Sequence, residues 1–252
     1  MVTDQAINQP ITGISSMATR SVLSDLIEEY AQLSGQRVVF ESVGGVEAAR
    51  RVQDGESFDL VVLATDAVDR LAGAGRIDAE SRVDVARSGV AIAVAAGAPR
   101  PDIGTEAAVR DAILAARSIG YSTGPSGTHL ARLFERWGIA KTIAPRIVQA
   151  PPGVPVGTLV ARGEVELGFQ QLSELMHLPG IDVIGPLPPE IQVITVFSAA
   201  VCTASQRHEA AQALLSFLVS PQADSAKRAQ GMEPARRRRL MHAPIKAFCN
   251  IS

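Results

Sequence analysis

Serine and glycine residues gather at three places where an apolar strand pattern gives way to a helix pattern. These are Ser15-Ser16, the run Ser42-Val43-Gly44-Gly45, and the loop at 122–128. A hydroxyl there caps the helix, and the free N–H groups with the helix dipole favour an anion. Adjacent glycines such as Gly44 and Gly45 let the backbone approach a ligand closely. A plain helix cap or a tight turn explains the first two places as well.

The loop at 122–128 is the strongest of the three. It reads STGPSGT and runs directly into an amphipathic helix pattern, so its hydroxyls and N–H groups favour an anion cradle. No lysine follows its second glycine, which excludes a P-loop. The residues expected to contact the anion here are Ser126, Gly127 and Thr128.

Other polar residues stand at similar strand ends. Gln170 and Gln171 close the strand pattern 167–169, and their amides can donate to an oxyanion or a carboxylate. The run 149–155 precedes another helix and offers backbone N–H groups around Gly153. Arg87, at the entry to an apolar strand, is either a bidentate clamp for a carboxylate or a surface arginine.

Two residues have the chemistry of a general base if the protein is an enzyme. His129 lies in the first turn of the helix after the 122–128 loop, and Glu47 lies in the first turn of the second helix. An exposed histidine and a solvated glutamate are the alternatives.

Composition excludes several classes of function. The chain has 252 residues, of which 46% are apolar, and a net charge of -2, so nothing in the balance favours nucleic-acid or membrane binding. The basic run Arg236–Arg239 is more simply a solvated tail. Cys202 and Cys249 form no metal-binding pattern, and GxSxG, HExxH and GxGxxG motifs are missing from the sequence. We therefore expect neither a metal nor a cofactor.

Localisation stays open from the sequence. Residues 1–10 are polar and lack the basic and apolar regions of a secretory signal, and no apolar run is long enough to cross a membrane. The chain as written is cytoplasmic, or it is periplasmic if a signal was removed.

Short apolar strands alternate with helical patterns along the chain, which predicts an α/β fold with mostly parallel sheets covered by helices on both faces. Two joints rich in proline and glycine, at 97–101 and 185–189, interrupt the alternation. We expect residues 1–96 plus 191–252 to form one lobe and residues 97–190 a second. The predicted architecture is two Rossmann-like mixed sheets with a ligand cleft at the hinge.

These patterns resemble the molybdate-binding branch of the periplasmic solute-binding proteins, which have the type II two-lobed fold. The resemblance covers about residues 11–234. It is carried by ISSMATRSVLSDLIEEY, FESVGGVEAARRVQDGESFDLVVLATDAVDRLAGAGRID, ARSGVAIAVAAGAPRPDI, PSGTHLARLFERWGI, LVARGEVELGFQQLSEL, TVFSAAV and ALLSFLVSPQA.

The resemblance implies an oxyanion held by Ser16 and by backbone N–H groups near Ser126 and Gly153. The family's second-loop serine is displaced or missing at Val43–Gly45, and its ligand-binding tyrosine aligns with Gln171. These two differences favour another ligand, such as a carboxylate. A divergent branch of the family also resembles aconitate isomerase, which moves an allylic double bond without a cofactor.

Three functions remain open on the sequence. The first is a binding protein for a small anion, which we expect to be a monomer, with an ABC-transporter permease as partner if it is exported. The second is an isomerase of a di- or tricarboxylate. The third is a cytoplasmic sensor or carrier that uses the same cleft.

Overall fold

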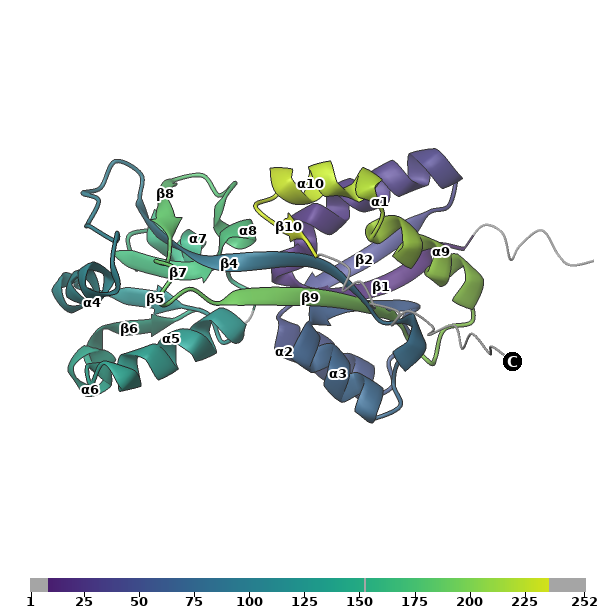
Figure 1. The fold of residues 1–252 in the computed structure, drawn as a ribbon, viewed down its shortest axis with the longest axis horizontal. Coiled ribbons are helices and arrows are strands. Elements are labelled where there is room, and N and C mark those ends of the chain that lie inside the picture. The colour runs from purple at the N-terminus through teal and green to yellow at the C-terminus, as the bar shows by residue number, and fades with distance from the viewer. Residues whose placement is uncertain (1–8, 152, 236–252) are drawn as a thin grey trace, which may run out of the picture.

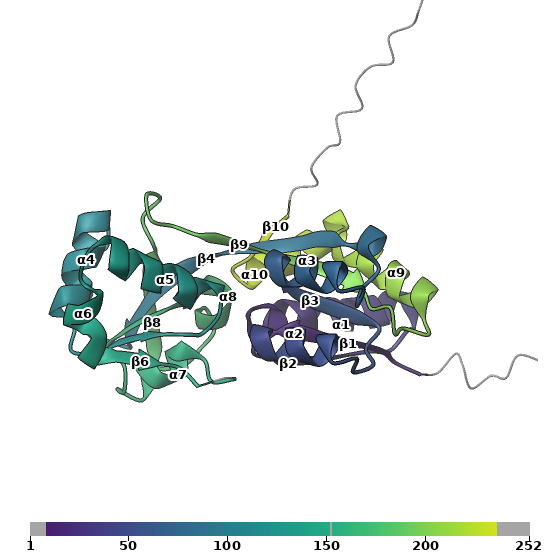
Figure 2. The same ribbon diagram turned by 90° about the horizontal axis from the view of Figure 1, so that it is seen from below.

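The computed structural model describes residues 9–151 and 153–235 and shows a mixed α/β protein of two lobes. Strands β4 (Val83–Ala95) and β9 (Ile194–Val201) run across the junction between the lobes (Figure 1). In Figure 2 the two strands pass along one side of the junction, and α8 lies at the junction itself. The basic run Arg236–Arg239 and Cys249 lie outside the described residues.

The sheet of the first lobe has three parallel strands, β2, β1 and β3. β9 lies antiparallel beside β3, and β4 lies antiparallel beside β9. β1 pairs with β2 and β3 in parallel, and β9 pairs antiparallel with both β3 and the first half of β4. One face of this sheet packs against α1, α9 and α10, and the other against α2 and α3. The elements are β1 Ile11–Ser16, α1 Arg20–Ser34, β2 Val38–Val43, α2 Gly45–Gln53, β3 Leu60–Ala64, α3 Thr65–Gly73, α9 His208–Leu218, α10 Asp224–Ala229 and β10 Glu233–Pro234, with 3₁₀ turns η1 Met17–Thr19, η2 Ala79–Ser81 and η4 Pro221–Ala223.

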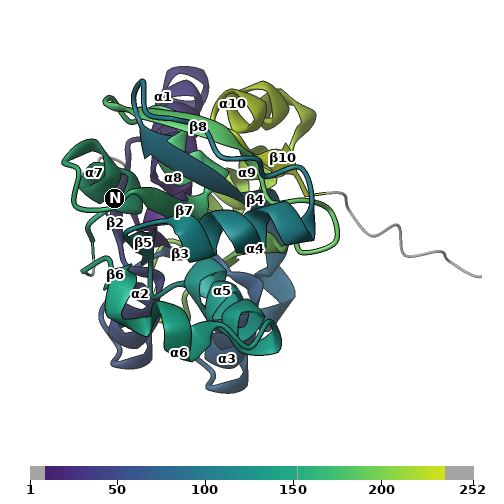
Figure 3. The ribbon, with the colours of Figure 1, turned by 90° about the vertical axis from the view of Figure 1, so that its left-hand side faces the viewer.

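The second lobe repeats the plan. β5 pairs in parallel with β6 and β7, while β7 and β8 pair antiparallel with the second half of β4. Helices α4, α5 and α6 share one core cluster with the sheet, and α7 packs in another cluster on the far side (Figure 3). The elements are α4 Glu106–Ala115, β5 Ile119–Tyr121, α5 Pro125–Arg136, α6 Ala140–Ile143, η3 Ala144–Arg146, β6 Ile147–Gln149, α7 Val156–Ala161, β7 Leu167–Gln171, α8 Leu172–Leu175 and β8 Ile181–Pro186.

Burial explains why the strand sequences are so apolar. β3 reads LVVLA, and its first four residues are fully buried because helices cover both faces of the sheet. Alternate residues of β3 serve opposite sides: Leu60 and Val62 join the cluster under α1 and α9, whereas Val61 and Leu63 join the cluster under α2 and α3. Because both faces of β3 are buried, the strand needs apolar residues at consecutive positions and not only at alternate ones.

The two-lobed α/β prediction is confirmed, with differences in detail. β4 is longer than the predicted strand 90–95, because its first seven residues pair with β9 in the sheet of the first lobe. The short elements α6, α8 and β10 were not predicted. The sheets are mixed, since both crossing strands run antiparallel to their neighbours. The lobe boundaries at 96/97 and 190/191 stay a prediction, and the change of sheet itself falls at Gly89–Val90 and at Ile194.

Within the described part of the chain, no helix is both long and apolar enough to span a membrane.

A buried aspartate fastens the start of the first sheet. Asp59, at 7% exposure, accepts hydrogen bonds from the backbone N–H of Thr12 at 2.8 Å, from its hydroxyl at 3.1 Å, and from the Ser205 hydroxyl at 2.6 Å. One carboxylate thus ties together the beginning of β1, the residue before β3 and the turn that precedes α9.

Replacing Asp59 by alanine removes the acceptor of three donors, all of which belong to buried or half-buried residues. Each stranded donor costs about 1–3 kcal/mol, so we expect Asp59→Ala to lower the free energy of unfolding by roughly 3 kcal/mol or more. Urea unfolding followed by circular dichroism measures this. Asp111→Ala, on the exposed face of α4, is the matched control, and an equal loss in the two variants would contradict the role given to Asp59.

Candidate functional site

The carboxyl ends of the parallel strands carry the residues predicted to bind an anion. In the first lobe β1, β2 and β3 end at Ser16, Val43 and Ala64, and in the second lobe β5 and β7 end at Tyr121 and Gln171. Ligands of parallel α/β sheets bind at this edge. The turn η1, which follows Ser16, contacts α8, which follows Gln171, so the two edges face one another across the junction.

Further contacts join the lobes beside this point. Gly231, in the turn after α10, lies so close to α8 that an added Cβ would sit 3.0 Å from atoms of both Leu172 and Met176. Its φ of +68° also favours glycine. The ring of His177 hydrogen bonds through Nε2 to the carbonyl oxygen of Ala229 at 3.1 Å. The lobes are thus in contact where α8 meets the first lobe.

Ser16 is the residue best placed to hold a ligand. Its hydroxyl is buried and has no hydrogen-bond partner among the described residues. It also precedes η1 and α1, although its side chain caps neither. An unpaired buried hydroxyl costs free energy, which an anion that accepts a hydrogen bond from it would offset.

Ser15 and Ser42 have a different role from the one expected. Ser42 lies inside β2, directly opposite Ser15 of β1, and the two hydroxyls hydrogen bond to each other at 2.8 Å. That contact ties the strand ends together. Gly44 and Gly45 do open α2, and a side chain at Gly45 would face the Cβ of Ser16 at 3.6 Å. The N–H groups of this first turn therefore lie beside Ser16.

The 122–128 loop turns sharply into α5. Ser126 and Gly127 are buried in its first turn, whereas Thr128 is exposed and its hydroxyl donates to the carbonyl of Gly124 at 3.3 Å. A Cβ on Gly127 would stand 1.6 Å from the carbonyl oxygen of Ser122, so only glycine fits there. Ser126 and Gly127 keep backbone N–H groups at the helix start, which suits an anion.

Gln171, the last residue of β7, lies in a cluster of polar side chains. The sequence did not reveal the other two members of this cluster, Thr195 and Ser88. Gln171 donates from Nε2 to the hydroxyl of Thr195 at 2.7 Å, and its Oε1 is buried without a described partner. Thr195 lies opposite Ser88 in the β4–β9 ladder, and the Ser88 hydroxyl is also buried and unpaired. A half-turn of the amide would let Oε1 accept from Thr195 and direct Nε2 to a ligand.

Both polar atoms of the Gln170 amide form hydrogen bonds within the protein. One of its partners is Glu174, which the sequence analysis did not single out. Oε1 of Gln170 accepts from the N–H of Val156 at the start of α7, and its Nε2 donates to the carboxylate of Glu174, both at 2.7 Å. Burial raises the pKa of Glu174 to about 7, against the opposing effect of the Gln170 hydrogen bond. A carboxyl group with a pKa near neutrality, one turn beyond Gln171, is suited to proton transfer.

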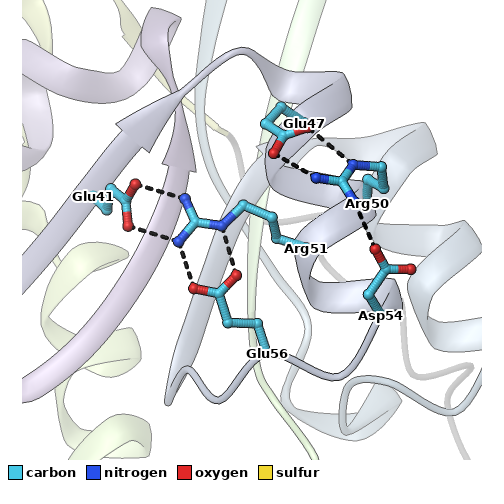
Figure 4. A network of polar contacts seen from close by, with 6 residues as sticks. All are labelled: Glu41, Glu47, Arg50, Arg51, Asp54 and Glu56. Atoms are coloured by element: carbon cyan, nitrogen blue, oxygen red, sulfur yellow. Dashed lines mark hydrogen bonds and ion pairs between the residues drawn. The ribbon is translucent and has the colours of Figure 1, made fainter.

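The two bases named from the sequence are less suitable. Arg50 holds Glu47 with two hydrogen bonds of 3.0 and 2.7 Å, and these lower the pKa of Glu47 (Figure 4). A carboxylate so engaged on the outer face of α2 is a weak base. His129 donates from Nε2 to the carbonyl oxygen of Ile191 at 2.8 Å, so that nitrogen is occupied.

Two other predicted residues, Gly153 and Arg87, have different surroundings. Gly153 is exposed in the loop before α7 with a φ of +78° and open space around it. Arg87 lines a cavity against α10 and β10, on the part of β4 that belongs to the first lobe. No group of three or more potential metal-binding side chains occurs among the residues that the structure describes.

Comparison with known proteins places the chain in a family. Residues 11–233 match the family model of the bacterial extracellular solute-binding proteins. The chain belongs to that family. An aconitate isomerase of Pseudomonas sp. is 37% identical to this family member over 235 residues, covering 90% of this chain and 89% of the relative.

Solved structures share the fold. The periplasmic molybdate-binding protein of Azotobacter vinelandii superposes with a TM-score of 0.76 at 19% identity, over 90% of this chain and 100% of that one. The sulfate-binding protein of Mycobacterium tuberculosis has a TM-score of 0.73 at 18% identity, over 91% and 88%. The resemblance drawn from the sequence is confirmed, and so is the type II two-lobed fold.

The raised pKa of Glu174 makes stability depend on pH in a definite direction. Between about pH 4.5 and 7 the folded protein keeps a proton on Glu174 that the unfolded chain has released, so stability falls as the pH rises through this window. The loss should reach up to about 3 kcal/mol. Glu174→Gln abolishes it, because the amide does not ionise.

Urea unfolding of both proteins at several pH values measures this difference. The stability gap between Glu174→Gln and the parent should widen from pH 4.5 to 7 and then level off. Glu209→Gln, in the exposed first turn of α9, should show no such trend. A gap that stays constant with pH would contradict the buried, protonated carboxyl.

Proposed function

We propose that this protein binds a small carboxylate or tetrahedral oxyanion between its lobes, at a site made by Ser16, the first turns of α2 and α5, and Gln171. The observation that carries the proposal is the Ser16 hydroxyl, which is buried, unpaired and next to the N–H groups of the α2 first turn. Family membership and the anion-binding neighbours support it.

A carboxylate is favoured over molybdate. The second loop presents Gly44 and Gly45 instead of a hydroxyl, because Ser42 is engaged with Ser15. Gln171 offers an amide, which pairs well with a carboxylate oxygen. The aconitate isomerase relative points in the same direction. Where the protein is exported, its expected partner is the permease of an ABC transporter, and we expect it to act as a monomer.

Thermal unfolding with candidate ligands tests the binding proposal. Because the Ser16 hydroxyl has no partner to lose, Ser16→Ala should leave the melting temperature of the free protein nearly unchanged. Citrate, cis-aconitate or trans-aconitate should raise the parent's melting temperature by mass action, and Ser16→Ala should weaken that response at least tenfold in ligand concentration.

Ser216→Ala, on the exposed face of α9, is the matched control and should respond like the parent. Molybdate, tungstate and sulfate form a second arm. A response to these ions alone would favour the oxyanion over the carboxylate. If no anion of either group shifts the melting temperature, the binding proposal fails.

A second function, isomerisation of a small tricarboxylate, is favoured by Glu174. The relative at 37% identity is an aconitate isomerase, and Glu174 has a buried carboxyl with a pKa of about 7 that accepts a hydrogen bond from Gln170. In this reaction ionised Glu174 takes a proton from the carbon next to a carboxylate. The electrons of that C–H bond form the new C=C bond while the old one opens, and the Glu174 carboxyl, whose proton can exchange with solvent, gives a proton to the far carbon of the allyl unit.

Hydroxyl and N–H donors would stabilise the charge that spreads into the carboxylates during this shift. The residues available are Ser16, the α5 first turn and Gln171. Burial of the carboxyl keeps its pKa close to neutral pH, which is where a base both accepts and returns a proton efficiently.

Proton-exchange NMR with trans-aconitate tests this second function. We expect interconversion with cis-aconitate and uptake of solvent deuterium by the parent. Glu174→Gln should lower turnover at least a hundredfold while its dissociation constant stays within about threefold. Glu209→Gln serves as the control. Binding without turnover in the parent would leave a solute-binding protein and exclude the isomerase.

A further inference from the structure

A second charged cavity lies away from the interlobe site, under α10. It has a volume of about 350 Å³ and is lined by the 3₁₀ turn η4, α10, β10 and Arg87 of β4. Three cationic side chains reach it, Arg87, Lys227 and Arg228, against two anionic ones, Asp224 and Glu233. The lining therefore carries a net positive charge.

Lys227 is the unusual member of this group. The residue is 1% exposed, and its closest charged partner is Asp224, whose carboxylate oxygen lies 3.6 Å from the ammonium nitrogen. That distance is too long for a hydrogen bond. Asp224 is also shared with Arg228 at 3.8 Å. The ammonium group has three N–H donors, and Asp224 is the one ion-pair partner that the described residues give it.

Arg87 adds unused donors to the same cavity. Its Nε is buried and lacks a hydrogen-bond partner, and the described residues provide no ion pair for its guanidinium. Glu233 stands directly opposite in the β4–β10 ladder but is exposed and forms no ion pair with it. Buried Lys227, with a single long ion pair, and half-buried Arg87, with an unpaired Nε, thus share one cavity, an arrangement that an anion with acceptor oxygens would stabilise.

We propose that this cavity is a second binding site for a small oxyanion with several acceptor oxygens, such as a phosphate or a dicarboxylate, held between Lys227 and Arg87. A guanidinium and an ammonium that line the same cavity match the spread of oxygens on such an ion. Asp224 does not oppose binding strongly, because Arg228 and Lys227 already neutralise it. The cavity is large enough for either class of ion.

Titration of the full chain with inorganic phosphate and, separately, with succinate tests the proposal. Ser16→Ala is the background, so that the interlobe site responds only at ligand concentrations at least tenfold higher. In that background at least one of the two ions should raise the melting temperature by several degrees at millimolar concentration. Adding Lys227→Met should weaken this response at least tenfold, whereas Lys141→Met, on the exposed surface of α6, should not change it.

Arg87→Gln gives an independent reading if Lys227→Met fails to fold, and it should weaken the response at least fivefold. Direct binding of the more effective ion, measured by calorimetry, should fall with the same variants. A response that survives both substitutions, or no response to either ion in the Ser16→Ala background, would overturn the second site while leaving the interlobe site untouched.

Discussion

The β4–β9 pair is the constraint on which the arrangement of this protein depends. β4 pairs with β9 in the first sheet and with β7 and β8 in the second, so it fixes the position of one lobe's strand ends relative to the other's. Thr195 and Ser88 lie opposite each other in that ladder, just where the sheet changes, and Thr195 orients the amide of Gln171. The hinge therefore also positions a residue of the proposed anion site.

Buried polar groups in this protein divide into two kinds. Asp59, Gln170 and the Ser15–Ser42 pair have their hydrogen bonds satisfied within the chain, and they join neighbouring elements. Ser16, Ser88 and Oε1 of Gln171 have none among the described residues, and two of them end the strands at which the lobes meet. Because an unpaired buried polar group is costly, its persistence at that edge is consistent with a ligand that completes it.

The sequence predicted the architecture well because its strongest signals are local. Apolar runs such as 60–64 and loops such as 122–128 define a strand or a helix start without reference to the rest of the chain. Glu174 was not found because its significance comes from burial and from Gln170, a contact that no pattern reveals. Arg87 was assigned to the main site because its position in the strand was visible, while the cavity under α10 that it faces was not.

The order of strands has a consequence for how the chain acquires its structure. β9 completes the first lobe by lying between β3 and β4, yet Leu60 and its partner Val201 are separated by more than half of the chain. During synthesis the first sheet therefore has a gap until the whole second lobe has emerged. Closing such a long loop late is slow, and until then β3 exposes an apolar edge to which a chaperone, or another copy of the unfinished chain, can bind.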